Sequence, residues 1–387
     1  MIPISKDSPM RVLISGASMA GLSAAYWFSR TGADVTVVER ADGLRLGGAP
    51  IDVRGDALGT AARMGVLEEI DRRRVTTPGP RPVLDERGEQ TATMDLTWFA
   101  NESTDDIEIS RDDLNAILLE AVDDSATFVF DDSIATLVDD PAHDAAHVKL
   151  AGGHAGDFDL VVGADGLHSS VRRLAFGPER DFLRHMGLYV ALLDLDAGTG
   201  WERGSFCVPG LTVTVRSELQ RPLAYVVFRS PELHYDFRDQ PAQRAIVVRR
   251  LSEIDVWQVP AVRDAFADPH SQGFYFDSLS QTLMPHWGRG RTALVGDAAH
   301  CASLLSGMGT SLAMTAAEHL ATSVAELPGD LTRAYRRYEE LQRPIVDKAQ
   351  ASVEGGHSEM MVPSTTTRLA SRNETLRRLA KEHSAAG

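Results

Sequence analysis

The feature that most constrains the fold is a glycine-containing loop between two β-type runs near the N-terminus. The run RVLIS at 11–15 leads into GASMAG at 16–21, apolar residues recur at helical spacing over 22–28, and a second run, DVTVVER, covers 34–40. These periodicities predict a strand, a helix and a second strand. Glycines at the two ends of such a loop permit a tight turn and close packing of the helix on the strand. We therefore predict a Rossmann-like βαβ unit within an α/β fold.

An acidic residue, Glu39, stands eighteen residues after Gly21, at the end of the second β-type run. In dinucleotide-binding units an acidic side chain at this place binds ribose hydroxyls, while the helix N-terminus faces the diphosphate. Ser18 occupies the place of the middle glycine of the usual fingerprint, so the alternative is a tight turn without a ligand. Glu39 argues against that alternative and against a 2′-phosphate, so we expect FAD or NAD rather than NADP.

Hydrophobic periodicity also predicts the elements that follow. Helices are expected over 55–73, over 109–122 with Ser110 as cap, near 242–266, over 310–327, and over 331–350 with an interruption at Pro344. Strands are expected over 127–130, 133–138, 147–151, 158–164, 188–197, 206–215, 222–230 and 291–300. The alternating strands between 180 and 285 favour an antiparallel sheet inserted between two segments of dinucleotide-binding character.

Charge and cysteine content limit the partners of the chain. The 39 basic and 55 acidic residues give a net charge of −16, which repels nucleic acid and anionic lipid. No apolar stretch is long enough to cross a bilayer, and the first ten residues lack the pattern of a secretory signal. Cys207 and Cys301 are too far apart in sequence to indicate a disulfide framework or a paired metal site. We expect a cytoplasmic protein without a nucleic-acid or membrane partner.

Two later segments carry further signatures. One is Asp165-Gly166-Leu167-His168-Ser169-Ser170-Val171-Arg172, which follows a β-type run; the other is Gly296-Asp297-Ala298-Ala299-His300 with Ser306-Gly307-Met308-Gly309 after it. Together with the N-terminal loop, and in this order, they resemble the aromatic-hydroxylase class of FAD-dependent monooxygenases. This is the group A flavoprotein family with the para-hydroxybenzoate hydroxylase-like fold, which includes the tetracycline-inactivating enzymes. The resemblance spans roughly residues 10–345.

The resemblance implies a division of the chain. It gives a discontinuous FAD-binding domain from 9–75, 100–178 and 286–328, an inserted antiparallel β-sheet substrate domain from 76–99 and 179–285, and a C-terminal helical region over 329–387. Aromatic and apolar residues of the insertion are candidate walls of a substrate pocket, although each is equally well explained as core. They are Phe206, Leu211, Tyr225, Phe228, Phe274 and Phe276.

The resemblance also implies site residues. It places Asp297 on the ribityl chain of FAD, the loop at 307–309 near the pyrimidine side of the flavin, and Arg111 near the diphosphate. It also implies that Arg45 and Arg54 lie near the flavin. The expected cofactor contacts are Gly16, Ser18, Met19, Ala20, Gly21, Glu39, Arg40, Arg111, Asp165, Gly166, Asp297, Gly307, Met308, Gly309 and Thr310. Ser303 and Leu304 stand where the family has proline, and Met308 stands where glutamine is common. These departures bear on how the flavin ring is placed.

The implied reaction is oxygenation. NADPH or NADH visits transiently and reduces FAD, O2 adds to the reduced flavin, and the hydroperoxide transfers one oxygen to an aromatic or polyketide-like substrate, such as an antibiotic. The flavin carries the chemistry, in agreement with the lack of a side-chain nucleophile motif or a phosphate loop in the sequence. The alternatives are a flavin-dependent reductase or dehydrogenase without oxygen insertion and a non-catalytic flavin- or ligand-binding protein. A monomer and a homodimer are both compatible with the sequence.

Three histidines, His143, His147 and His154, lie close together in sequence among alanine, glycine and aspartate. This setting is typical of a solvated hairpin, and no fourth ligand at a fixed spacing is apparent. We expect no metal site.

Overall fold

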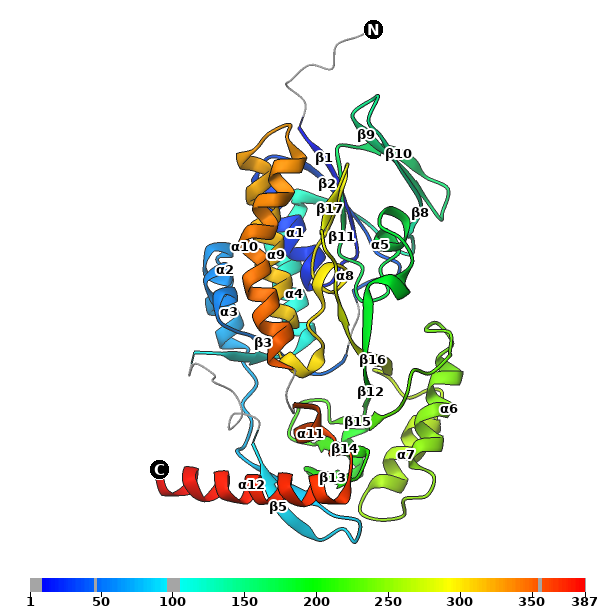
Figure 1. Ribbon diagram of the computed structural model, residues 1–387, viewed down its shortest axis with the longest axis vertical. Helices are drawn as coiled ribbons and strands as arrows, with labels where there is room; N and C mark the ends of the chain where they lie inside the picture. The colour runs from blue at the N-terminus through cyan, green and yellow to red at the C-terminus, as the bar shows by residue number, and fades with distance from the viewer. Residues whose placement is uncertain (1–8, 45–46, 96–104, 354–356, 387) are drawn as a thin grey trace.

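The computed structural model describes residues 9–44, 47–95, 105–353 and 357–386. Within this part of the chain, a six-stranded sheet has the order β17-β18-β11-β1-β2-β7 (Figure 1). Its strands are β17 (Gly288–Arg289), β18 (Thr292–Leu294), β11 (Leu160–Gly163), β1 (Arg11–Ser15), β2 (Asp34–Val38) and β7 (Ala126–Val129). All neighbours pair in parallel except β17 and β18. The predicted Rossmann-like sheet is confirmed, and three segments distant in sequence build it.

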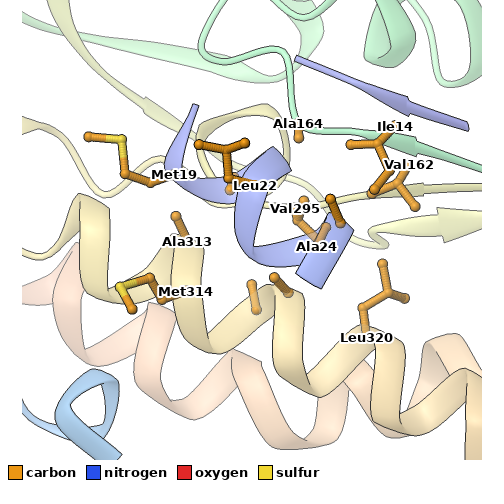
Figure 2. Packing of buried hydrophobic residues seen from close by; sticks show 14 of the residues in the cluster. Ile14, Met19, Leu22, Ala24, Val162, Ala164, Val295, Ala313, Met314 and Leu320 are labelled. Atoms are coloured by element: carbon orange, nitrogen blue, oxygen red, sulfur yellow. The ribbon is translucent and has the colours of Figure 1, made fainter. Parts of the chain in front are cut away.

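Helices pack on one face of this sheet. They are α1 (Met19–Arg30), α4 (Arg111–Val122), α9 (Gly309–Glu326) and α10 (Leu331–Ser352), with α2 (Asp56–Met64) and α3 (Leu67–Arg72) outside them. Figure 2 shows Leu22 and Ala24 of α1 in one buried cluster with Ala313 and Leu320 of α9. The other face carries α5 (Ser170–Ala175) and a three-stranded sheet of β8 (Ile134–Asp140), β9 (Ala145–Leu150) and β10 (Ala155–Phe158). The sheet is covered on both faces, which explains its nearly continuous apolar strands.

A second large sheet has the order β16-β12-β15-β14-β13-β4-β5. Its strands are β16 (Tyr275–Thr282), β12 (Leu183–Asp194), β15 (Leu223–Arg229), β14 (Leu211–Arg216), β13 (Gly204–Val208), β4 (Arg81–Leu84) and β5 (Gln90–Met94). The pairs are antiparallel except β13 with β4, which is parallel. An apolar cluster joins one face to α6 (Gln240–Leu251) and α7 (Val259–Ala267). The predicted inserted sheet is confirmed.

Small elements connect the two large sheets. They are the pair β3 (Ile51–Val53) and β6 (Ile107–Ile109), the short helix α8 (Asp297–His300) and the 3-10 turn η5 (Leu304–Ser306). Strands β4 and β5, from the predicted segment 76–99, join those of 179–285 in one sheet. The domain limits themselves stay a prediction, and the limit at 99–100 lies outside the described residues.

The helical prediction fails in three places. The single helical stretch expected near 242–266 is two helices, α6 and α7. The helix expected over 55–73 is two helices, because Gly65 takes the left-handed conformation, with φ of 76°, and ends α2. Pro344 does not interrupt α10. It lies on the exposed side of that helix, as does Glu340 four residues before it, so water can satisfy the carbonyl group that loses its intrahelical partner.

The C-terminal region ends in α11 (His357–Met361) and α12 (Thr366–Ala386). Figure 1 shows α12 lying along β5, at the end of the molecule opposite the six-stranded sheet. Leu376 of α12 is buried against Val83 and Met94. The C-terminal helix predicted from sequence therefore packs on the second sheet.

Candidate functional site

The three signature segments meet at their glycines. A β-carbon on Gly16 would lie 2.6 Å from the carbonyl oxygen of Ala164, the residue before Asp165, and one on Gly296 would lie 2.9 Å from the β-carbon of Ala20. Only glycine allows these backbones to approach so closely. Figure 2 shows the result, with Met19, Ala164 and Ala313 around the start of α1. The segments predicted to bind one cofactor are thus in direct contact.

The loop at 16–21 makes the predicted tight turn. Gly16 has φ of 103°, and its amide donates to the carbonyl oxygen of Val38 at 2.8 Å. A β-carbon on Gly21 would lie 1.8 Å from the carbonyl oxygen of Gly16. Ser18 is the N-cap residue of α1, but its side chain caps no amide and contacts Met19 Sδ instead. Replacement of the middle glycine by Ser18 therefore leaves the turn intact.

Two long helices begin at the site without side-chain caps. Neither α1 nor α9 has a capping side chain or an acidic residue in its first turn. By contrast, Ser110 caps α4 and Asp330 caps α10. Uncapped N-terminal amides carry a partial positive charge and are suited to anionic or carbonyl oxygens. The first turn of α1 contains Met19, Ala20 and Gly21, and that of α9 contains Gly309 and Thr310.

Glu39 follows β2 and reaches the loop. Its carboxylate accepts hydrogen bonds from the amides of Ala17 at 2.8 Å and Ala41 at 2.9 Å. Each carboxylate oxygen can accept a further hydrogen bond, so the group is still able to bind ribose hydroxyls. The neighbouring Arg40 is exposed.

Asp165 has a structural role in this fold. Its carboxylate accepts hydrogen bonds from the amides of Ser170 at 2.7 Å and Val171 at 3.2 Å, at the start of α5. Burial raises the pKa of the Asp165 carboxyl group, an effect that these hydrogen bonds oppose. Gly166 has φ of 78°, and no atom lies within 4 Å of the place where its β-carbon would be. Gly166 therefore leaves room for a ligand. Asp165 holds the helix, because its other oxygen accepts a hydrogen bond from the hydroxyl group of Ser169, the N-cap residue of α5.

The side chain of Asp297 is exposed to solvent, although its neighbours in the chain are buried. Asp297 begins α8 between Gly296 and Ala298. Nevertheless, the enclosing protein raises the pKa of its carboxyl group, and the positive charge of Arg111 opposes that rise. An accessible carboxylate is the type of group that accepts hydrogen bonds from sugar hydroxyls.

The loop before α9 is shaped by Arg54. Gly307 has φ of 62°, and a β-carbon there would lie 3.0 Å from Arg54 Nη1. The amide of Arg54 donates to Ser311 Oγ at 2.9 Å, which fixes β3 against α9. Arg54 thus lies beside the loop that contains Met308. Arg45, named with it, lies outside the described residues.

The expected pocket walls divide between the two faces of the second sheet. Phe206, Leu211, Phe228, Phe274 and Phe276 belong to the cluster that packs against α6 and α7, so they are core residues. Tyr225 belongs to the opposite face, in a cluster that includes Leu305 of η5. Tyr225 alone among the six faces the loop before α9.

The hairpin expected around the three histidines is present as β8 and β9, and two of the histidines contact one aspartate. His143 Nδ1 lies 2.7 Å and His147 Nε2 lies 3.0 Å from the same oxygen of Asp140. These hydrogen bonds hold the pKa of Asp140 well below its usual range. One potential ligand atom from each of the three residues lies within 4.8 Å of the others. The hairpin was predicted, but its convergence on Asp140 was not, and His154 is not part of it.

One titratable cluster could not be predicted from the sequence because its members are far apart in the chain. His168 Nε2 lies 3.2 Å from Asp277 Oδ1, and His168 Nδ1 lies 3.0 Å from Glu179 Oε1. Burial lowers the pKa of His168, but the hydrogen bonds to Asp277 and Glu179 outweigh burial and raise it to about 9. The imidazolium therefore ties the segment after Gly166 to β16 of the second sheet.

These features fit FAD. The two uncapped helix starts suit its diphosphate and the carbonyl edge of its flavin, Glu39 and Asp297 suit its sugar hydroxyls, and the glycines remove side chains where backbones meet. The family described as "FAD binding domain" matches residues 9–349 of this chain. The family assignment therefore agrees with the geometry of the loop, the acidic residues and the helix starts.

Individual proteins extend the comparison. An uncharacterized protein of Mycobacterium tuberculosis is 40% identical over 88% of this chain and 91% of its own length. A protein of Legionella longbeachae named flavin-dependent monooxygenase is 32% identical over 88% of this chain and 87% of its own length. The crystal structure of the tetracycline destructase Tet(51) has a TM-score of 0.82 and 28% identity, and the match covers 96% of each chain. The chain belongs to the FAD-binding domain family and is a flavin-dependent monooxygenase.

Proposed function

We propose that this monooxygenase uses NADPH or NADH and O2 to hydroxylate an aromatic or polyketide-like small molecule, and that antibiotics of the tetracycline type are among its substrates. The observation that carries the proposal is the contact of Gly16 with Ala164 and of Gly296 with Ala20. These two close approaches bring together the three segments that would hold one FAD. The likeness to Tet(51), which is named a tetracycline destructase, supports the substrate class.

The residues of this chain would bind and orient the cofactor. The first turn of α1, with Gly16, Ser18, Met19, Ala20 and Gly21, would face the diphosphate, and Glu39 would hold a ribose. Asp297 would accept hydrogen bonds from the ribityl hydroxyls. Reduced FAD supplies the activation of oxygen, so no side-chain nucleophile is required.

The remaining expected contacts would complete the site. Gly307, Met308, Gly309 and Thr310 would bring backbone amides to the flavin edge at the start of α9. Arg111, which lies near enough to Asp297 to influence its pKa, would place positive charge near the diphosphate. Arg40 and Gly166 would line the outer part of the site, and Asp165 would act through α5.

The proposed partners and compartment follow from the net charge, the helices and the cysteines of the chain. The net charge of −16 disfavours nucleic acid. Among the described residues, no helix has both the length and the apolar character needed to cross a membrane. Cys207 and Cys301 are free, which supports the proposal of a reducing compartment, the cytoplasm. The proposal leaves monomer and homodimer open, and the pyridine nucleotide would bind only transiently.

The test is to incubate the FAD-loaded protein with NADPH or NADH, O2 and a panel of phenols and polyketides that includes tetracycline. We expect substrate-stimulated oxidation of the nucleotide and a product with one added oxygen atom, detected by mass spectrometry and labelled from 18O2. Nucleotide oxidation with a reduced or dehydrogenated product would instead identify a reductase or dehydrogenase. Failure to bind FAD would identify a ligand-binding protein.

A further inference from the structure

Two histidines converge on one aspartate at the hairpin of β8 and β9. His143 Nδ1 lies 2.7 Å and His147 Nε2 lies 3.0 Å from the same atom, Asp140 Oδ2. The other oxygen of Asp140 accepts a hydrogen bond of 3.0 Å from the amide of Ala142, which fixes the carboxylate. Two imidazole nitrogens and one carboxylate oxygen therefore lie within 4.8 Å of one another.

The strand register explains why these side chains meet. His147 lies on the central strand of the three-stranded sheet, directly opposite Val138 of β8 and Asp157 of β10. Alternate residues of a strand point to the same face, so Asp140 shares the face of Val138 and is the diagonal neighbour of His147. Val138 is 57% exposed. This face of the sheet is therefore open to an ion from solution.

The residues that flank the loop between β8 and β9 hold it in place. The carboxylate of Asp139 lies against Gly290, where a β-carbon would overlap with it. Asp144, which has φ of 56°, forms an ion pair with Arg291. Both contacts are with the turn between β17 and β18, at the edge of the six-stranded sheet. The loop that positions the histidines is thus anchored at both ends.

Asp157 orients one of the imidazole rings. Its Oδ1 lies within hydrogen-bond distance of His147 Nδ1, whereas the opposite nitrogen of the ring faces Asp140. Histidine ligands of metal ions almost always donate their other ring N–H to such a partner, because this fixes the tautomer that can bind the ion. In the metal-free protein Nε2 faces Asp140 across a hydrogen bond. An ion takes the place of that proton, which passes to water.

Charge and size favour a divalent cation. Among the described residues, Asp140 and Asp157 form ion pairs with histidines only, and none with a lysine or an arginine. With neutral imidazoles the cluster has the charge of two carboxylates, which a divalent ion balances. Tetrahedral zinc, at about 2.0–2.1 Å from nitrogen and oxygen, separates its ligand atoms by about 3.3 Å. The observed separations must widen by a few tenths of an ångström, which the exposed His143 side chain allows.

We propose that Asp140, His143 and His147 bind a zinc ion, with water in the fourth position and Asp157 as a positioning residue. Imidazole and carboxylate groups are common zinc ligands. The expectation of no metal site considered only the histidines, whereas the carboxylates of this site come from β8 and β10. Figure 1 shows these strands at the end of the molecule opposite α12. The ion links β8 to β9 and stabilises the hairpin.

The test is zinc binding to the FAD holoenzyme, prepared without a histidine tag and freed of metal ions with EDTA. Isothermal titration with zinc chloride should show one saturable site per chain. Asp157→Ala should weaken binding about 10- to 100-fold, and His147→Ala and Asp140→Asn should weaken it at least as much. Asp140→Asn keeps an acceptor for the amide that fixes this side chain. His154→Ala, at the exposed turn between β9 and β10, is the control and should bind zinc like the wild type.

Two further measurements identify the ligands and the effect of the ion. The X-ray absorption spectrum of the zinc-loaded protein should show imidazole nitrogens at about 2.0–2.1 Å. Zinc should raise the thermal midpoint of the wild type, but not that of His147→Ala, and EDTA should reverse the rise. The flavin spectrum and the midpoint without zinc show that each variant folds. Lack of saturable binding, wild-type affinity in His147→Ala, or a spectrum without imidazole scattering would overturn the proposal.

Discussion

Arg172 Nη1 donates a hydrogen bond of 2.9 Å to the carbonyl oxygen of Ala298, a residue 126 positions later in the chain. The Arg172 side chain is fully buried, and its Nη2 donates to the carbonyl oxygen of Leu167 and pairs with Glu179 at 3.3 Å. One guanidinium therefore joins the segment after Asp165 to the turn that begins with Asp297. Two of the three signature segments are held together by a side chain and not only by the sheet.

Arg172→Met should destabilise the protein strongly. It leaves the carbonyl groups of Leu167 and Ala298 without their donor, and loss of one partner from a buried charged network costs about 2–5 kcal/mol. Urea unfolding monitored by circular dichroism measures the change. The exposed neighbour offers a control, since Arg173→Met should stay within about 0.5 kcal/mol of the wild type. A loss of less than about 1 kcal/mol for Arg172→Met would contradict the bridging role.

Gly21→Ala should abolish high-affinity FAD binding. The new methyl group would lie 1.8 Å from the carbonyl oxygen of Gly16, so α1 must move away from the loop that precedes it. FAD titration of the apoprotein, followed by flavin fluorescence, measures the affinity. Gly43→Ala is the matched control, because no atom lies within 4 Å of the added carbon. An unchanged FAD affinity in Gly21→Ala would show that the close approach is not required.

Local signals predicted the elements that bring the site together. The glycines of the loop, the acid after β2 and the cap at Ser110 each depend on a few neighbouring residues, and the structure contains all three features. The helix over 55–73 was wrong because periodicity continues across Gly65, whereas the left-handed backbone at that residue ends the helix. The interruption at Pro344 was wrong because tertiary packing of α10 on α9 outweighs the intrinsic cost of proline.

Features that depend on register across the sheets could not be predicted. Alternation in the second sheet indicates two faces, but it does not say which face α6 and α7 cover. The assignment of Phe206 to the core and of Tyr225 to the opposite face therefore required the structure. The contact of His168 with Asp277 joins residues 109 positions apart, and no local pattern marks it.

Glu39→Ala and Asp297→Ala should each weaken FAD binding about tenfold or more, because each removes a carboxylate proposed to bind sugar hydroxyls. Glu39→Ala should also lower the free energy of unfolding, more than Asp297→Ala does. Glu39 also accepts hydrogen bonds from two backbone amides, whereas the exposed Asp297 side chain does not cap α8. Equilibrium FAD titration and urea unfolding separate the two effects, with Asp34→Ala, on the exposed start of β2, as control. Wild-type affinity in both variants would refute the site assignment.

His168 should stabilise the protein in a pH-dependent manner. Its pKa is about 9 in the folded protein, above about 6.5 in an unfolded chain, because Asp277 and Glu179 hold the imidazolium. A raised pKa means that the contribution is complete below pH 6.5 and is lost as the pH rises through 9. The upper limit of this contribution to the free energy of unfolding is about 3 kcal/mol.

The variant that tests this is His168→Gln, compared with the wild type by urea unfolding at a fixed, saturating FAD concentration. The difference in unfolding free energy should be largest near pH 6 and should shrink as the pH rises past about 9. Arg172, which pairs with Glu179, stays charged throughout this range, so the titration belongs to the imidazole. His270→Gln, at an exposed position, should show no such trend. A difference that is constant from pH 6 to pH 10 would mean that His168 contributes through packing, including its stacking on Phe237, and not through its charge.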